Sequence, residues 1–92
     1  MDTVNFVETQ FPKLDFFTRQ IVKVHGGRHP ELSKVRELFE QLKTKAQAGN
    51  LDFRPEFTEL ETVTNNYVVP GDACEAYRAT YELLEYLDQT TK

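Results

Sequence analysis

Three short breaks divide the chain into segments with a helical period, and this pattern constrains the fold more than any other feature. The breaks are Gly26-Gly27, Gly49-Asn50 and Pro70-Gly71, residue pairs that favour turns. Between them apolar residues recur every three or four positions, and no alternating strand pattern competes. Because the connections are short, neighbouring helices should be antiparallel. The sequence predicts one all-α domain, residues 1–92, an up-down-up-down four-helix bundle with helices over about 2–25, 30–48, 53–66 and 72–89.

Proline interrupts the first segment. Its apolar stripe consists of Val7, Phe11, Leu14, Phe17, Ile21 and Val24. Pro12 lies within this stripe, and a proline inside a helix removes one backbone hydrogen bond. Two outcomes remain open: the helix bends at Pro12, or its stable part begins near that residue.

Residues that favour helix starts introduce the second and fourth segments. Pro30 suits the first position of a helix, and Glu31 then complements the helix dipole. Asp72 follows Pro70-Gly71 and is expected to cap the fourth helix, with Glu75 completing a capping box.

Composition and charge exclude several classes of protein. The formal net charge of −4 and the lack of a basic stripe argue against nucleic-acid binding. No apolar run is long enough to span a membrane, and the polar, acidic N-terminus is unlike a signal peptide. A single cysteine, Cys74, precludes an internal disulfide and fits the reducing cytoplasm. We therefore expect a cytoplasmic protein without nucleic-acid or membrane partners.

The histidines are the first candidates for chemistry. His25 ends the first stripe, where it either stabilises the helix end or acts as a metal ligand or acid–base group. His29 precedes Pro30 and reads as part of a helix start. Cys74 reads as a small buried residue, and the carboxylates read as parts of solvated helix faces.

Two longer stretches resemble a known family. They are "KVHGGRHPELSKVRELFEQL" (23–42) and "TNNYVVPGDACEAYRATYELL" (64–84). Together they resemble the hemerythrin-like domain of bacterial di-iron proteins that repair iron–sulfur clusters. The resemblance implies a four-helix fold and a carboxylate-bridged iron pair held by His and Glu, with His25 at a metal-ligand position.

The other ligand positions of that family fall on residues that do not bind iron. They fall on Val4, Lys45, Gly49 and about Asn50, and the last pair would lie beyond Lys92. One imidazole cannot hold two irons.

We therefore expect a degenerate, non-catalytic module without a cofactor, acting in protein–protein interaction or regulation, as a homodimer or with a protein partner. The alternative is an iron-binding protein of the cluster-repair or nitrosative-stress type. In that case, dimerisation would complete a site from His25 and carboxylates such as Glu8, Glu56 or Glu59.

Overall fold

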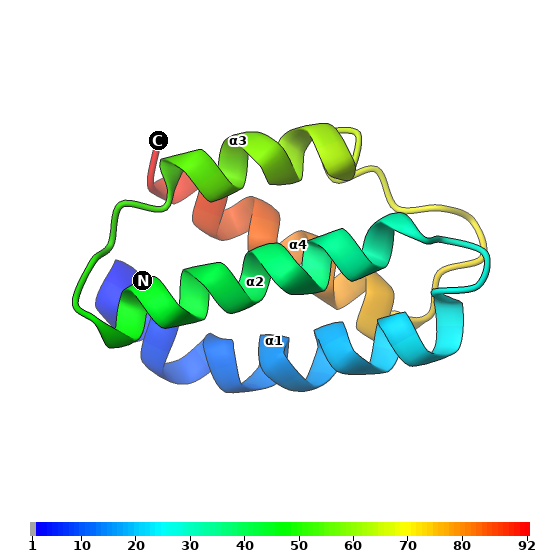
Figure 1. Cartoon of the computed structure of the whole chain (residues 1–92), viewed down its shortest axis with the longest axis horizontal. Helices are drawn as coiled ribbons and strands as arrows, with labels where there is room; N and C mark the ends of the chain where they lie inside the picture. Colours follow the sequence, from blue (N-terminus) through cyan, green and yellow to red (C-terminus); the bar gives the residue numbers. More distant parts are fainter. Residues whose placement is uncertain (1) are drawn as a thin grey trace.

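The fold is all-helical. The computed structural model describes residues 2–92, and the helices of this part pack as a four-helix bundle in which successive helices run in opposite directions (Figure 1). α1 packs against α2 and α4, and α2 also packs against α3. The predicted fold class is confirmed. The helices are α1 Thr3–His25, α2 Glu31–Gln47, α3 Arg54–Val63 and α4 Glu75–Thr90.

The core combines aliphatic and aromatic side chains from every helix and from the connections around α3. Phe11 touches the rings of Phe39 and Phe53, with centroids 5.2 and 6.3 Å apart. The contact with Phe39 is edge-to-face, an arrangement that stabilises a core beyond the area it buries. The buried apolar residues are Phe6, Phe11, Leu14, Ile21, Leu32, Val35, Leu38, Phe39, Leu42, Phe53, Phe57, Leu60, Tyr67, Tyr77, Tyr81, Leu84 and Leu87.

α1 runs through Pro12 without interruption, so of the two outcomes left open above, the later start of the helix does not occur. Asp2 caps it: its carboxylate accepts a hydrogen bond from the backbone N–H of Asn5 at 2.8 Å. The predicted stripe is wrong at its end, because Val24 is 66% exposed. At 3.6 residues per turn, Val24 lies roughly 80° around the axis from the buried Leu14.

α3 ends earlier than predicted, at Val63. Asn65, Asn66 and Tyr67 all have positive φ, between 52° and 63°, so the chain makes a left-handed turn there. Thr64 supports this turn, since its hydroxyl accepts a hydrogen bond from the Tyr67 N–H at 2.9 Å. The turn directs the side chain of Tyr67 into the core.

α4 begins later than predicted. Cys74 occupies the N-cap position without a side-chain cap hydrogen bond, and the helix starts at Glu75. The predicted capping box is therefore wrong. Asp72 binds His29 instead, a pairing described below.

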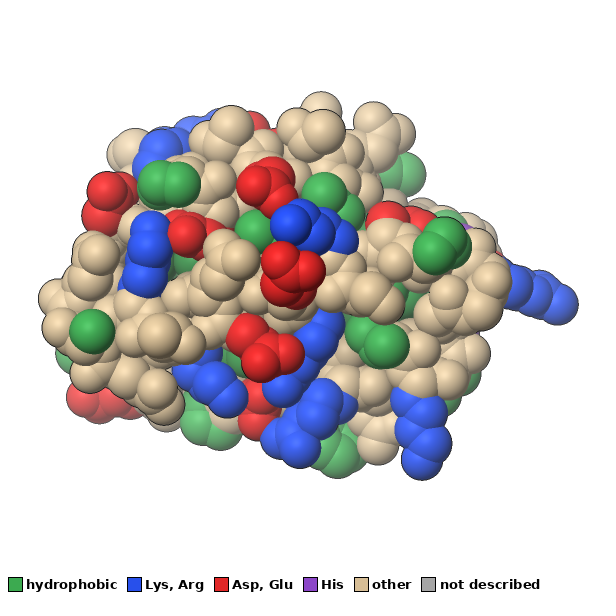
Figure 2. All heavy atoms as spheres, in the orientation of Figure 1, with side chains coloured by type: hydrophobic (Ala, Val, Ile, Leu, Met, Phe, Trp, Pro, Cys, Tyr) green, Lys and Arg blue, Asp and Glu red, His purple; other side chains and the backbone are tan. Residues whose placement is uncertain are grey.

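The surface view in Figure 2 shows acidic and basic side chains mixed over the middle of one face, with hydrophobic patches between them. Neither the positive nor the negative side chains dominate this face. Among residues 2–92, no helix combines the length and apolar character needed to cross a membrane.

Candidate functional site

The two histidines meet at one end of the bundle. There the α1–α2 turn lies beside the connection from α3 to α4 (Figure 1). The ring centroid of His25 is 6.4 Å from that of His29 and 5.3 Å from that of Tyr77. His29 also contacts Tyr77, at 5.5 Å. We call His25, His29, Asp72 and Tyr77 the end cluster.

His25 and Tyr77 each keep a polar atom without a partner. Nε2 of His25 and the hydroxyl of Tyr77 are both buried, and within the described part of the chain neither makes a well-formed hydrogen bond, although Tyr81 lies close enough to Tyr77 to act on its pKa. Burial also raises the pKa of Tyr77. The neutral hydroxyl can donate and accept, and Nε2 can do either according to its tautomer. Such atoms can be satisfied by a small polar molecule.

His29 has a larger role than the predicted helix start. Its Nε2 lies 3.1 and 3.0 Å from the two carboxylate oxygens of Asp72, and its Nδ1 lies 3.4 Å from Glu31. The hydrogen bond to Asp72 raises the pKa of His29, and His29 in turn lowers the pKa of Asp72. This pair ties the α1–α2 turn to the α3–α4 connection.

A small hollow of about 170 Å³ opens beside the end cluster. Its wall includes His29, Glu31, Tyr77 and Tyr81, together with Asn65 of the left-handed turn. The hollow is large enough for only a small group. Cys74 is exposed, so its predicted burial is wrong.

The end cluster does not match the donor set of a di-iron centre. Among residues 2–92, no group of three or more His, Cys, Asp or Glu side chains lies close enough to hold a metal ion. Glu8 is 17 residues from His25 along α1, which separates them by about 25 Å.

The other proposed carboxylates are engaged elsewhere. Glu56 binds Lys45 at 2.8 Å, and Glu59 binds Lys34 at 3.1 Å. Lys45 therefore pairs with a carboxylate at a position where the resembled family has a ligand. The residues of one chain do not fit the iron pair.

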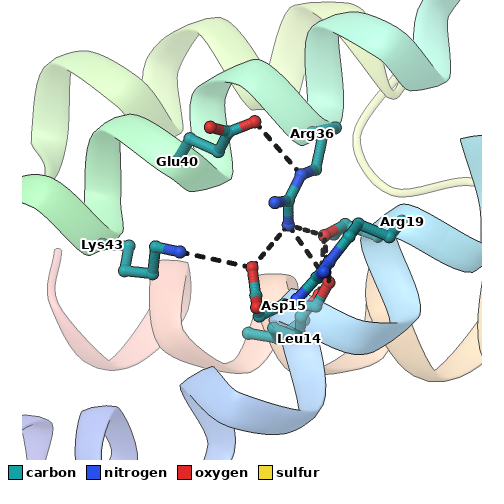
Figure 3. Close-up of polar contacts among 7 residues, drawn as sticks. Leu14, Asp15, Arg19, Arg36, Glu40 and Lys43 are labelled. Atoms are coloured by element: carbon teal, nitrogen blue, oxygen red, sulfur yellow. Dashed lines mark hydrogen bonds and ion pairs between the residues drawn. The ribbon is translucent and has the colours of Figure 1, made fainter.

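Sequence reasoning missed the polar residues that form contacts between helices. Asp15 of α1 binds Arg36 of α2 at 2.8 Å and also contacts Arg19 and Lys43 (Figure 3). The hydrogen bond from Arg36 is the main cause that lowers the pKa of Asp15 to about 2. A second group joins α3 to α4: the buried Asp88 binds Arg54 at 2.6 Å and the Tyr67 hydroxyl at 2.8 Å.

These contacts correct the prediction that the carboxylates lie on solvated faces, since Asp88 and Glu56 are buried. Their spacing along the chain carries no signal, because residues 54 and 88 meet only in the folded molecule. The sequence offers one indication of a buried carboxylate: an acidic residue at a position where the helical period places apolar residues. Asp88 fits this, since it comes four residues after the core residue Leu84 and seven after Tyr81.

Comparisons with known proteins found no relative of this chain. No protein-family model matches the chain, and neither does a curated protein or a solved structure. The hemerythrin-like resemblance therefore stays a prediction that rests on the two stretches quoted above.

Proposed function

We propose that this chain is a non-catalytic helical module, hemerythrin-like in origin, that acts by binding another protein. One observation carries the proposal: an apolar groove between the first half of α1 and the end of α2. Two hollows of about 270 and 350 Å³ form it, and they adjoin, since Val7 and Ala46 line both. We call it the α1–α2 groove. Its apolar wall consists of Val4, Val7, Phe11, Pro12, Ala46 and Leu51.

The rim of the groove is exposed although its side chains are large and apolar. Val4 is 54% exposed and Leu51 is 40% exposed, while Phe11 at the floor is buried. Scattered apolar residues need no explanation, but a continuous apolar hollow is typical of a binding site. Grooves between helices commonly receive the apolar face of a further helix.

The polar side chains support a binding role over catalysis. Asp15, Glu56 and Asp88 are each engaged by a cation from another element, so their charge contributes to helix packing. A catalytic group needs a reacting partner within hydrogen-bond reach. Within the end cluster, only His29 has a carboxylate at that distance, that of Asp72, and this pair ties two connections together.

The alternative, iron binding completed by dimerisation, retains one supporting observation: the unpartnered Nε2 of His25. Because that atom is buried, a second chain could reach it only after the end cluster rearranges. Elemental analysis of protein purified without chelator separates the two functions. The module should contain far less than one iron per chain and unfold at the same temperature with and without chelator. Stoichiometric iron that is lost in His25→Ala would favour the alternative.

The binding role is tested by site-specific photocrosslinking in the cells from which the chain comes. A photoreactive amino acid at position 51 should yield one defined adduct, identified by mass spectrometry. The matched control is position 58, because Thr58 is also exposed but lies on α3, away from the groove. Equal crosslinking from both positions, or none from position 51, would contradict the proposal.

A further inference from the structure

We infer that the α1–α2 groove receives an amphipathic helix of another protein, with basic residues at one end and acidic residues at the other. This inference rests on the proposed function and specifies the chemistry of the partner. It follows from the length of the groove and from the different charges at its two ends.

The length of the groove suits about three helical turns. Its lining residues on α1 extend from Val4 to Asp15. Eleven residue steps along a helix span about 16 Å, which a partner helix of about 11 residues would match. Such a helix presents apolar side chains at positions i, i+3 or i+4, and i+7. These anchors would rest on Val7, Phe11 and Ala46.

One end of the groove lies beside a cluster of charged side chains with a net positive charge. Lys43 and Asp15 line it there, and Arg19 and Arg36 also contact Asp15 (Figure 3). Arg36 binds one further carboxylate, that of Glu40, at 3.1 Å. Three cations thus surround two carboxylates, and the side chain of Arg19 remains 65% exposed. An incoming Glu or Asp can therefore gain charge-assisted hydrogen bonds at this end.

The other end of the groove offers acceptors. The exposed Glu8 lines it, beside Val4 and Leu51, and no Lys or Arg lines this hollow. Pro12 has no N–H, so the backbone carbonyl of Glu8 lacks the donor that a helix normally supplies four residues later. A Lys or Arg of the partner can pair with the exposed Glu8 carboxylate.

A second copy of the chain fits the groove less well. Outside the groove, the large exposed apolar residues of α1 are Phe16 and Val24, whereas the groove needs three anchors. The exposed residues of α4 include Glu75, Glu82 and Glu85, and its last turn has no basic residue to meet Glu8. The charge pattern therefore favours a different protein.

The test uses three labelled 14-residue synthetic peptides with the same leucine anchors. One has Lys at one end and Glu at the other, one has Glu at both ends, and one has Lys at both ends. Fluorescence anisotropy should show at least tenfold tighter binding of the mixed-charge peptide. The reason is that each uniform peptide places like charges together at one end of the groove.

Variants of the protein make the test specific. Glu8→Lys makes both ends of the groove basic, so it should prefer the peptide with Glu at both ends. Ala46→Arg should weaken all three peptides at least tenfold by filling the groove. Glu82→Lys is the matched control on α4 and should keep the preference of the wild type, since Glu82 is exposed and lines neither hollow.

Three outcomes would overturn the inference: equal affinity for the three peptides, a Glu8→Lys preference unchanged from the wild type, or self-association through the groove in light scattering that Ala46→Arg abolishes. If no peptide binds while position 51 still crosslinks to one identified protein, the proposed function stands and the charge pattern inferred for the partner is wrong.

Discussion

Asp88 is a charged residue in the core, and its burial depends on hydrogen bonds from two partners. Its carboxylate is fully buried, and burial by itself would raise its pKa. The hydrogen bonds from Arg54 and Tyr67 outweigh that effect, and the pKa of Asp88 is lowered. Removing one partner of such a group leaves the others buried and unsatisfied, which is more costly than losing an exposed ion pair. Asp88 therefore makes the position of α3 depend on α4.

His29 and Asp72 form a comparable pair nearer to the surface, and here the charge of the histidine depends on pH. The pKa of His29 is raised above 6.5, so its contribution to stability is complete below pH 6.5 and is lost as the pH rises through the folded-state pKa. The pKa of Asp72 is lowered below 3.8, so its contribution is present above pH 3.8 and is lost as the pH falls through its folded-state pKa. The pair stabilises the fold between these limits.

We predict that the melting temperature of the wild type falls between pH 6 and pH 9 more than that of Asp72→Asn. The variant lacks the carboxylate that holds the proton on His29. Circular dichroism melts at both pH values measure the difference. Asp52→Asn is the matched control because Asp52 is exposed and makes no ion pair among the described residues. If Asp72→Asn loses as much stability as the wild type over this range, the pair does not act as described.

α1 contains a residue that lowers the stability of the helix itself. It continues through Pro12, which removes one backbone hydrogen bond and crowds the preceding turn. Burial of Phe6, Phe11 and Leu14 on both sides of the proline offsets this cost. Pro55 differs, because it lies in the first turn of α3, where a missing N–H has no helical partner to lose.

We predict that Pro12→Ala raises the free energy of unfolding by about 1–3 kcal/mol, because the new N–H can bond to the carbonyl of Glu8. Pro55→Ala should change it by no more than about 0.5 kcal/mol. Urea denaturation measures both variants. A destabilised Pro12→Ala would show that the proline is needed for the path of α1.

The packing of the whole molecule is uneven. α1 packs against two helices, whereas α3 packs mainly against α2 and is tied to α4 by Arg54, Tyr67 and Asp88. Local stability follows the number of buried contacts, so a weakly packed helix opens first. The short length of α3 and the left-handed turn that follows it have the same effect.

We predict that hydrogen exchange will be faster in α3 than in α1 and α2. Asp88→Asn should accelerate exchange further in α3, with a smaller change in α2, because it weakens the contact to Arg54. Mass spectrometry of proteolytic fragments resolves the helices. Glu85 is exposed and forms no ion pair among residues 2–92, so it provides the control variant Glu85→Gln, for which we expect the wild-type pattern. Equal protection of all helices would contradict this account.

The sequence by itself determined the helical class, the number of helices and the approximate places of the breaks between them, because apolar period and turn residues act locally. It also placed His25 at the end of the first helix, next to a glycine pair. Tertiary structure alone decided that His29 pairs with Asp72, 43 positions away, and that the α1–α2 groove stays open. The spacing of two residues along the sequence does not give the distance between them in the folded molecule. Their contacts depend on how the helices pack and on a turn in which three residues have a left-handed backbone conformation.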